Sequence, residues 1–298
     1  AERDALKKRE AELLAAHERA WLGELAPHLL DRPPEPNYDD PNHDWTQPEP
    51  PPSPRVEYRW RRGRLAELTV ECVTVKLAQA LADAPAAWAL DTLRVTSTAY
   101  NLGMQDEAAP RRVPPPPEYR TYDEWLDLLG APCLRTVRVF QLGDENEPPE
   151  DGWCDNHTRA YGIERLVAEM PRVEELHLIC KSYNAAALFA LPTLTRLRVL
   201  RMYALGEPWG DAVYEIPLDV LAANPALGRL AHLSLHPHFA HDRSFVPLAR
   251  VAPLLRSPNL PNLTHLQLRL SDMGDDGVRE IIASGVLKRL KWLDLRHG

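Results

Sequence analysis

Glycine and cysteine are both scarce in this sequence, with 14 and 4 residues among 298. The few glycines are not grouped in a phosphate-binding pattern, which argues against a nucleotide-binding loop. Four cysteines in a chain of this length do not make a disulfide framework, so we expect a reducing compartment, the cytoplasm. No apolar run approaches the roughly 20 residues of a membrane-spanning helix, and the charged N-terminal stretch is unlike a secretory signal.

A surplus of basic residues is also missing, because the formal net charge is −8. The acids are concentrated in two stretches: residues 31–54 hold six acids and one arginine, a net of −5, and residues 144–155 hold six acids and no base. Nucleic-acid binding depends on a basic field that neutralises phosphates. The charge distribution therefore argues against a dedicated nucleic-acid binder.

What the sequence does contain is a recurrent six-residue block of the form Leu-x-x-Leu-x-Leu, with Val or Met also allowed at the apolar places. Eight such blocks follow one another along the chain, which is improbable by chance even in a leucine-rich sequence. The blocks begin at Leu65, Leu90, Leu134, Val173, Leu197, Leu230, Leu263 and Leu290.

Successive blocks start 25, 44, 39, 24, 33, 33 and 27 residues apart, and the long intervals contain insertions. Short stretches with helical spacing, such as Val278, Ile281 and Ile282, lie between the blocks, and Pro or Gly precedes several of them. The pattern predicts an α/β fold, a leucine-rich-repeat solenoid: a curved parallel sheet of about eight strands with helices on the convex side. The asparagine of the standard repeat is absent after every block, so other bonds must satisfy the turn carbonyls.

Three regions follow from this organisation. Residues 1–30 are predicted to form an amphipathic helix that caps the first repeat, since an array of repeats exposes its core at each end. Residues 31–54 contain nine prolines and are interpreted as an acidic linker or loop, with a role that the sequence leaves open. Residues 55–298 are predicted to form the repeat domain. Because the chain starts with Ala1, it could be a piece of a longer protein.

Two N-terminal stretches resemble a known family. Arg9-Glu-Ala-Glu-Leu-Leu-Ala-Ala-His-Glu-Arg-Ala-Trp-Leu-Gly-Glu-Leu25, followed by Trp60-Arg-Arg-Gly63, is similar to the leucine-rich-repeat proteins of planctomycetes such as Gemmata that carry a short N-terminal repeat-companion domain. The unit Asp272-Met-Gly-Asp-Asp-Gly-Val278 also resembles their repeats. The Pro-rich insert departs from that family's compact pattern. The resemblance implies a bacterial scaffold for protein recognition, and it supplies no catalytic residues.

Side chains alternate along a strand, so the third, fifth and seventh residues of each block should point away from the core onto the concave face. Arginine, histidine and aromatic residues dominate these places from the third block onward, and such residues are enriched at the energetic centres of protein interfaces. We therefore predict a non-catalytic scaffold that binds a protein partner of unknown identity. The predicted contact residues are Arg138, Phe140, His177, Arg201, Tyr203, His232, His236, His265, Arg269 and Trp292.

Two alternatives stay open. Cys154, His157, His177 and Cys180 are zinc-type ligands, although residues three apart on a strand face opposite sides. The chain could also serve as a structural or sensor arm of a larger multidomain protein. A nucleophile with a base and an orienting group cannot be identified, so the sequence supports neither catalysis nor a cofactor.

Overall fold

The structure is a computed structural model that describes most of the chain with side chains. The acidic Pro-rich stretch after residue 31 lies outside the described part, and so do Cys154, His157 and Arg269. The side chains of residues 203, 204, 236 and 237 are likewise not described. The described ranges are 2–31, 56–71, 73–96, 128–143, 160, 162–180, 184–204, 216–237, 248–268 and 273–295.

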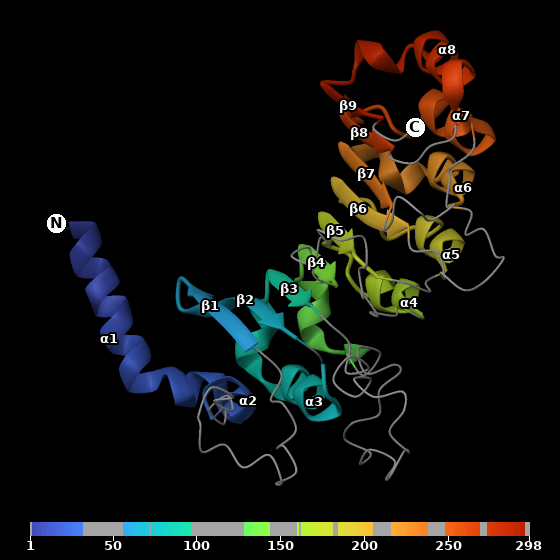
Figure 1. The fold of residues 1–298 in the computed structure, drawn as a ribbon. Helices are drawn as coiled ribbons and strands as arrows, with labels where there is room; N and C mark the ends of the chain where they lie inside the picture. Colours follow the sequence, from blue (N-terminus) through green and yellow to red (C-terminus); the bar gives the residue numbers. More distant parts are fainter. Residues whose placement is uncertain are drawn as a thin grey trace, which may run out of the picture.

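One sheet of nine strands runs through the whole molecule, and its spatial order equals the sequence order (Figure 1). The first pair of strands is antiparallel, and every later pair is parallel. The predicted run of parallel strands is thus confirmed, with one additional antiparallel strand at the edge. The strands are β1 Val56–Arg61, β2 Arg64–Val70, β3 Thr92–Val95, β4 Val139–Leu142, β5 Glu175–Leu178, β6 Val199–Ala204, β7 His232–Pro237, β8 His265–Leu268 and β9 Trp292–Asp294.

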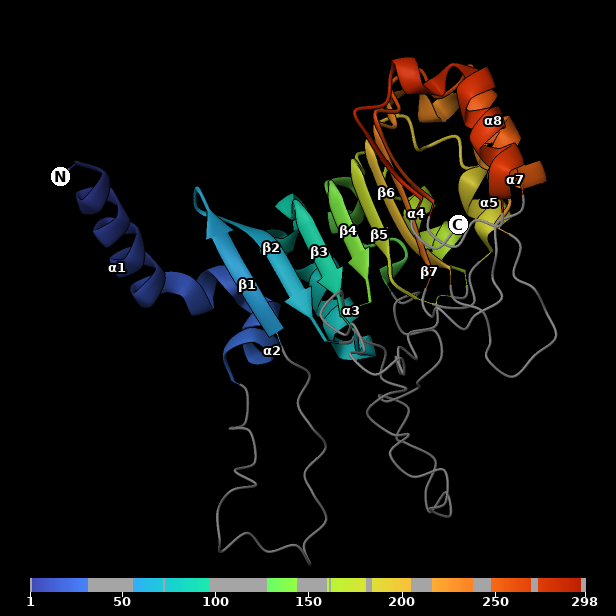
Figure 2. The same ribbon diagram turned by 45° about the horizontal axis from the view of Figure 1, so that its top comes forward.

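Helices alternate with the parallel strands and lie together on one side of the sheet (Figures 1 and 2). The sheet is curved, and the helices lie on the outer side of the curve. The other face of the sheet lies on the inner side. The predicted α/β class is therefore confirmed. The α-helices of this layer are α3 Val75–Asp83, α4 Ile163–Ala168, α5 Ala185–Phe189, α6 Leu218–Ala223, α7 Leu248–Arg256 and α8 Gly274–Ser284, and the 3-10 helices are η2 Pro85–Ala89, η6 Pro132–Arg135, η7 Pro225–Arg229 and η8 Val286–Lys288.

The hydrophobic core lies between the sheet and this helix layer. Along the parallel strands from β2 to β8, apolar side chains at every second residue are buried against the helices, as the period-two geometry of a strand requires, and Leu293 of β9 is partly buried. The strand register places these residues in continuous rows across the sheet. One row is Leu68, Leu93, Phe140, Leu176, Leu200, Leu233, Leu266 and Leu293, and the next is Val70, Val95, Leu142, Leu178, Met202, Leu235 and Leu268.

The register corrects the third predicted block, which begins at Val137 rather than Leu134. Phe140 pairs with Leu93 on one side and Leu176 on the other, and it is fully buried. The prediction that Phe140 points outward is therefore wrong, because the predicted block starts three residues too early. Two overlapping stretches, beginning at Leu134 and at Val137, compete for the block. The first fits the pattern, which admits Leu, Val and Met at the apolar places, whereas the second places a phenylalanine there. Burial of the large aromatic ring decides between them.

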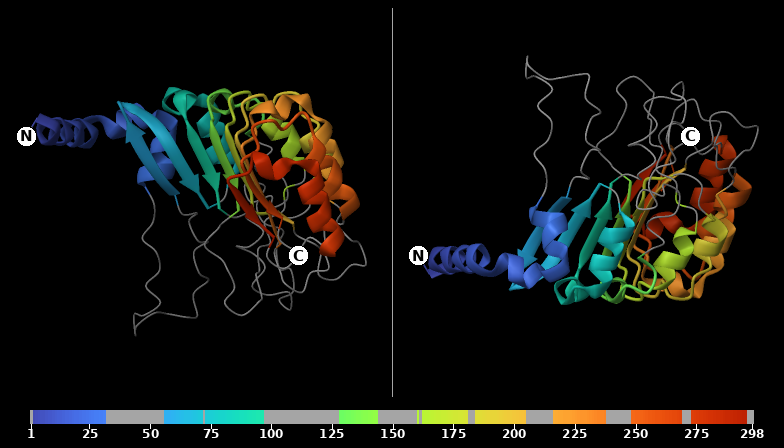
Figure 3. Two further views of the ribbon diagram at one scale, coloured as in Figure 1. Left: turned by 90° about the horizontal axis from the view of Figure 1, so that it is seen from above. Right: turned by 90° about the horizontal axis from the view of Figure 1, so that it is seen from below.

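The N-terminal stretch forms α1 Glu2–Leu22, η1 Gly23–Leu25 and α2 Ala26–Leu30. Only its second part contributes to the core, through Leu22, Leu25, Ala26 and Leu29. Leu6 in α1 is 66% exposed, and α1 extends away from the sheet (Figure 3). Burial of this stretch against the core therefore depends on residues 22–29 rather than on the full length of α1.

Strand β1 covers the edge of β2 and had not been predicted. Arg62 and Gly63 both have positive φ angles, of 55° and 72°, which is typical of a tight antiparallel hairpin turn. Glu18 of α1 accepts hydrogen bonds from the Tyr58 hydroxyl at 3.1 Å and the Trp60 indole nitrogen at 2.8 Å. These bonds tie the end of α1 to the hairpin.

Backbone bonds continue the strand pairing by one residue at three strand exits. The amides of Thr96, Gly143 and Ile179 each donate to a carbonyl at the end of the preceding strand. On the helix side, Asn224 performs a related task. Its amide nitrogen donates to the carbonyls of Phe189 at 2.7 Å and Leu191 at 3.0 Å, next to the end of α5.

We expect Asn224→Ala to lower the free energy of unfolding by about 1–3 kcal/mol, because buried carbonyls lose their donor. Asn224 is buried, and its own oxygen also accepts a bond from the Ala226 amide. Urea denaturation measures the effect. The control is Asn184→Ala, which removes one exposed helix-capping bond and should cost about 1 kcal/mol. Equal losses in the two variants would contradict the assigned role of Asn224.

Candidate functional site

The candidate site is the sheet face opposite the helices, called here the strand face. Its outward side chains form two rows, because they alternate with the buried residues of each strand. The strand register aligns the members of each row. The first row is Glu67, Thr92, Val139, Glu175, Val199, His232, His265 and Trp292, and the second is Thr69, Arg94, Gln141, His177, Arg201, Ser234, Gln267 and Asp294.

Five of the predicted contact residues lie on this face, between β5 and β9: His177, Arg201, His232, His265 and Trp292. Tyr203 and His236 are paired in register at the ends of β6 and β7, but their side chains lie outside the described part, and so does all of Arg269. Arg138 precedes β4, and Phe140 belongs to the core.

His232, His265 and Trp292 form a row of flat rings across β7, β8 and β9. The two imidazoles stack with centroids 4.0 Å apart and an interplanar angle of 20°. Trp292 pairs with His265 in the strand register and is 44% exposed. The Thr264 hydroxyl lies 2.9 Å from Nδ1 of His265, which fixes the orientation of that ring. The result is an accessible aromatic row held on a hydrogen-bonded sheet.

The pKa of His232 is lowered from its ordinary value, first by burial and then by electrostatic interaction with His265 and with two arginines, Arg198 and Arg201. Glu175 acts in the opposite direction and is the weaker influence. The His232 ring is therefore uncharged at neutral pH. The shift also shows that both guanidinium groups lie close enough to His232 to influence its charge.

A polar row runs beside the aromatic one. The Ser234 hydroxyl donates a hydrogen bond to Oε1 of Gln267, and Gln267 and Asp294 are both buried although they belong to an outward row. This connection was not predicted, since the three residues come from separate blocks. Only the register brings them into one line.

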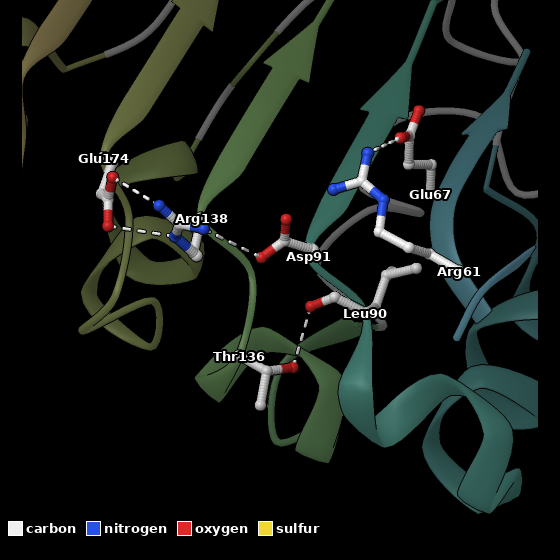
Figure 4. Close-up of polar contacts among 7 residues, drawn as sticks. All are labelled: Arg61, Glu67, Leu90, Asp91, Thr136, Arg138 and Glu174. Atoms are coloured by element: carbon white, nitrogen blue, oxygen red, sulfur yellow. Dashed lines mark hydrogen bonds and ion pairs between the residues drawn. The ribbon is translucent and has the colours of Figure 1, made fainter. Parts of the chain in front are cut away.

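Arg138 lies in an ion-pair series at the amino ends of the strands (Figure 4). Its Nε and Nη2 donate to both carboxylate oxygens of Glu174 at 3.0 and 2.8 Å, and its Nη1 lies 3.7 Å from Asp91. The bond from Arg138 lowers the pKa of Glu174, with smaller contributions from Arg198 and Arg196. Arg138 thus connects three neighbouring strand segments. A partner that binds Arg138 would have to compete with Glu174 and Asp91 for its guanidinium group.

Similar polar links occur elsewhere along this edge. The Thr136 hydroxyl donates to the carbonyl of Leu90 at 2.9 Å, and Arg61 of the β1 hairpin donates to Glu67 at 3.1 Å (Figure 4). Half-exposed ion pairs of this kind contribute about 0–1 kcal/mol each. They align the segments more than they stabilise the fold.

The zinc-type ligands do not come together in the described part of the chain. His177 lies on the strand face with its Nε2 3.6 Å from Glu175, whereas Cys180 belongs to the hydrophobic core. Full burial raises the pKa of the Cys180 thiol, so it stays protonated. Among the described residues no group of three or more His, Cys, Asp or Glu side chains could hold a metal ion. Cys154 and His157 lie outside the described residues.

Searches with known sequences give no assignment: no protein-family model matches the chain, and no curated protein matches it. The resemblance to planctomycete repeat proteins therefore stays a prediction. Among the described residues, none of the helices is long and apolar enough to span a membrane.

Proposed function

We propose that this chain is a leucine-rich-repeat solenoid that works as a non-catalytic protein-recognition module and binds its partner through the strand face between β5 and β9. The observation that carries the proposal is the exposed row of His232, His265 and Trp292, with Arg201 beside it. Aromatic and arginine side chains provide most of the binding energy at protein interfaces.

The sheet supports this role by holding the outward side chains in fixed positions. Neighbouring strands lie about 4.8 Å apart, so the row presents three rings at regular intervals on a backbone that is already ordered. Binding to such a surface loses little conformational entropy in the module itself. An extended or flat partner surface fits this geometry better than a small molecule, which prefers an enclosed pocket.

The repeat interpretation rests on the register. Eight apolar blocks, the third of them moved to Val137, pair side by side in sequence order across the parallel sheet. Helical segments connect them on one side. Under this proposal the planctomycete resemblance, with residues 1–30 as a cap and residues 55–298 as the repeat domain, accounts for the organisation of the chain.

The test is affinity capture from an extract of the source cells with immobilised protein, followed by mass spectrometry. We expect the double substitution Arg201→Ala and Trp292→Ala to reduce recovery of the partner at least about tenfold. Arginine and tryptophan are among the residues that contribute most of the binding energy at interfaces. The matched control is Trp88→Ala, which removes an exposed tryptophan from η2 in the helix layer. The proposal is wrong if the double variant recovers the same proteins as the unchanged chain.

A further inference from the structure

We infer that the partner bound by the strand face presents an acidic segment in which carboxylates flank an aromatic side chain. The inference rests on the proposed function and adds the chemistry of the partner. Its basis is a local excess of positive charge around the aromatic row, in a chain whose total charge is negative.

The segments that lead into and form β6 and β9 are basic, with three Lys or Arg residues each, whereas the segment of β7 adds one arginine and that of β8 adds none. Residues 194–204, 225–237, 257–268 and 285–295 together hold seven Lys or Arg residues and one acid, a net of +6, whereas the whole chain has −8. The single acid, Asp294, is buried. Arg196, Arg198, Arg201 and Lys291 lie on or shortly before β6 and β9, whereas Arg229 and Lys288 belong to η7 and η8 of the helix layer and Arg289 follows η8.

The arginines of β6 and of the segment before it form one electrostatic neighbourhood. Arg196 and Arg198 both lower the pKa of Glu174, and Arg198 and Arg201 both lower the pKa of His232. Arg196, Arg198 and Arg201 are exposed. Their positive field therefore extends over the surface that carries the imidazole stack.

Acids at the neighbouring strand do not neutralise this field. Glu174 already binds Arg138 with both carboxylate oxygens, and Glu175 lies 3.6 Å from His177. Neither Arg196 nor Arg198 forms an ion pair with any residue that the structure describes. Carboxylates of a partner could pair with these two guanidinium groups without displacing an internal acid.

The aromatic row determines what lies between the partner's carboxylates. His232 is uncharged at neutral pH, so the row offers flat, apolar faces to an aromatic ring of the partner. From β6 to β9 the distance is about 14 Å, which an extended segment of about five residues covers. A nucleic acid could also use arginines and rings, but the chain's total charge of −8 disfavours a polyanion with one phosphate per nucleotide.

The test uses fluorescently labelled probes and the full chain, with binding measured by anisotropy. The first probe is a peptide of about ten residues with Glu on both sides of one Phe; the others replace Glu with Lys, replace Phe with Glu, or are an oligothymidine of similar charge. We expect the Glu-Phe peptide to bind more tightly than the other three, with affinity that decreases as salt is raised.

Two sets of variants locate the binding. Arg196→Ala with Arg198→Ala should weaken the Glu-Phe peptide about tenfold or more, because the two charge-assisted contacts are lost. Arg165→Ala with Arg279→Ala removes the same charge from exposed positions of α4 and α8 and should leave affinity unchanged. Trp292→Ala should weaken the Glu-Phe peptide but not the all-Glu peptide.

Four outcomes would overturn the inference: no binding of the Glu-Phe peptide, equal binding of the Lys-Phe peptide, tighter binding of the oligothymidine, or equal losses in the two arginine pairs. The capture experiment on Arg201 and Trp292 is independent of these probes. If the peptide fails while capture still depends on those residues, the recognition surface stands and the acidic chemistry is wrong.

Discussion

Replacement of Phe140 with alanine is expected to lower the free energy of unfolding by about 3–5 kcal/mol, because it leaves a cavity in the core. Phe140 is among the largest fully buried side chains, and it lies in the row between Leu93 and Leu176. Urea denaturation followed by tryptophan fluorescence measures the change. Because folded proteins are only marginally stable, a decrease of this size in the free energy of unfolding should also reduce the yield of folded protein.

The control for Phe140 is its neighbour Val139, which belongs to an outward row and is only partly buried. Val139→Ala should change the free energy of unfolding by less than about 1 kcal/mol. If Phe140→Ala were neutral for stability and instead weakened partner capture, the register with Val137 at the start of the third block would be refuted. The pair of variants therefore decides between the two overlapping patterns.

The second large effect is expected at Gly143, which directly follows β4. Its φ angle is +94°, and a Cβ atom there would lie 1.8 Å from the carbonyl oxygen of Ile179. Neither the backbone conformation nor the space admits a side chain, so Gly143→Ala should cost about 3–5 kcal/mol or prevent folding. Differential scanning calorimetry and the yield of soluble protein measure this.

Gly228 in η7 provides the comparison for Gly143. No atom lies within 4 Å of a Cβ atom built on Gly228, so Gly228→Ala should be within about 1 kcal/mol of the unchanged chain. If the two variants had equal melting temperatures, the close approach of strand exits β4 and β5 would be wrong. At the same two strand exits the Ile179 amide donates to the Leu142 carbonyl at 2.8 Å.

The leucine pattern predicted the order and direction of the parallel strands because each block carries its own apolar spacing. Seven of the eight block starts agree with the register, and the third is displaced by three residues. Strand β1 was missed because it lacks the Leu-x-x-Leu-x-Leu spacing, although Val56, Tyr58 and Trp60 alternate with charged residues as in a half-buried strand. Its position depends on the turn at Arg62 and Gly63 and on contact with Glu18, neither of which local spacing reveals.

The candidate site was predictable where it depends on alternation alone. His177, Arg201, His232, His265 and Trp292 occupy the predicted outward positions. Which of them touch, and how their charges interact, depends on side-chain geometry. The sequence predicted neither the stacking of His232 on His265 nor the competition of Glu174 and Asp91 for Arg138.

A sheet whose strands follow one another in sequence order has a consequence for how this chain can vary. In the described part of the chain each parallel strand bonds only to the strands immediately before and after it, so a connecting segment can lengthen without exchanging any of these strand partners. With Val137 as the third start, the intervals between blocks already range from 24 to 47 residues. Residues can therefore be inserted into or deleted from the connections while the outward residues of the strand face keep their alignment.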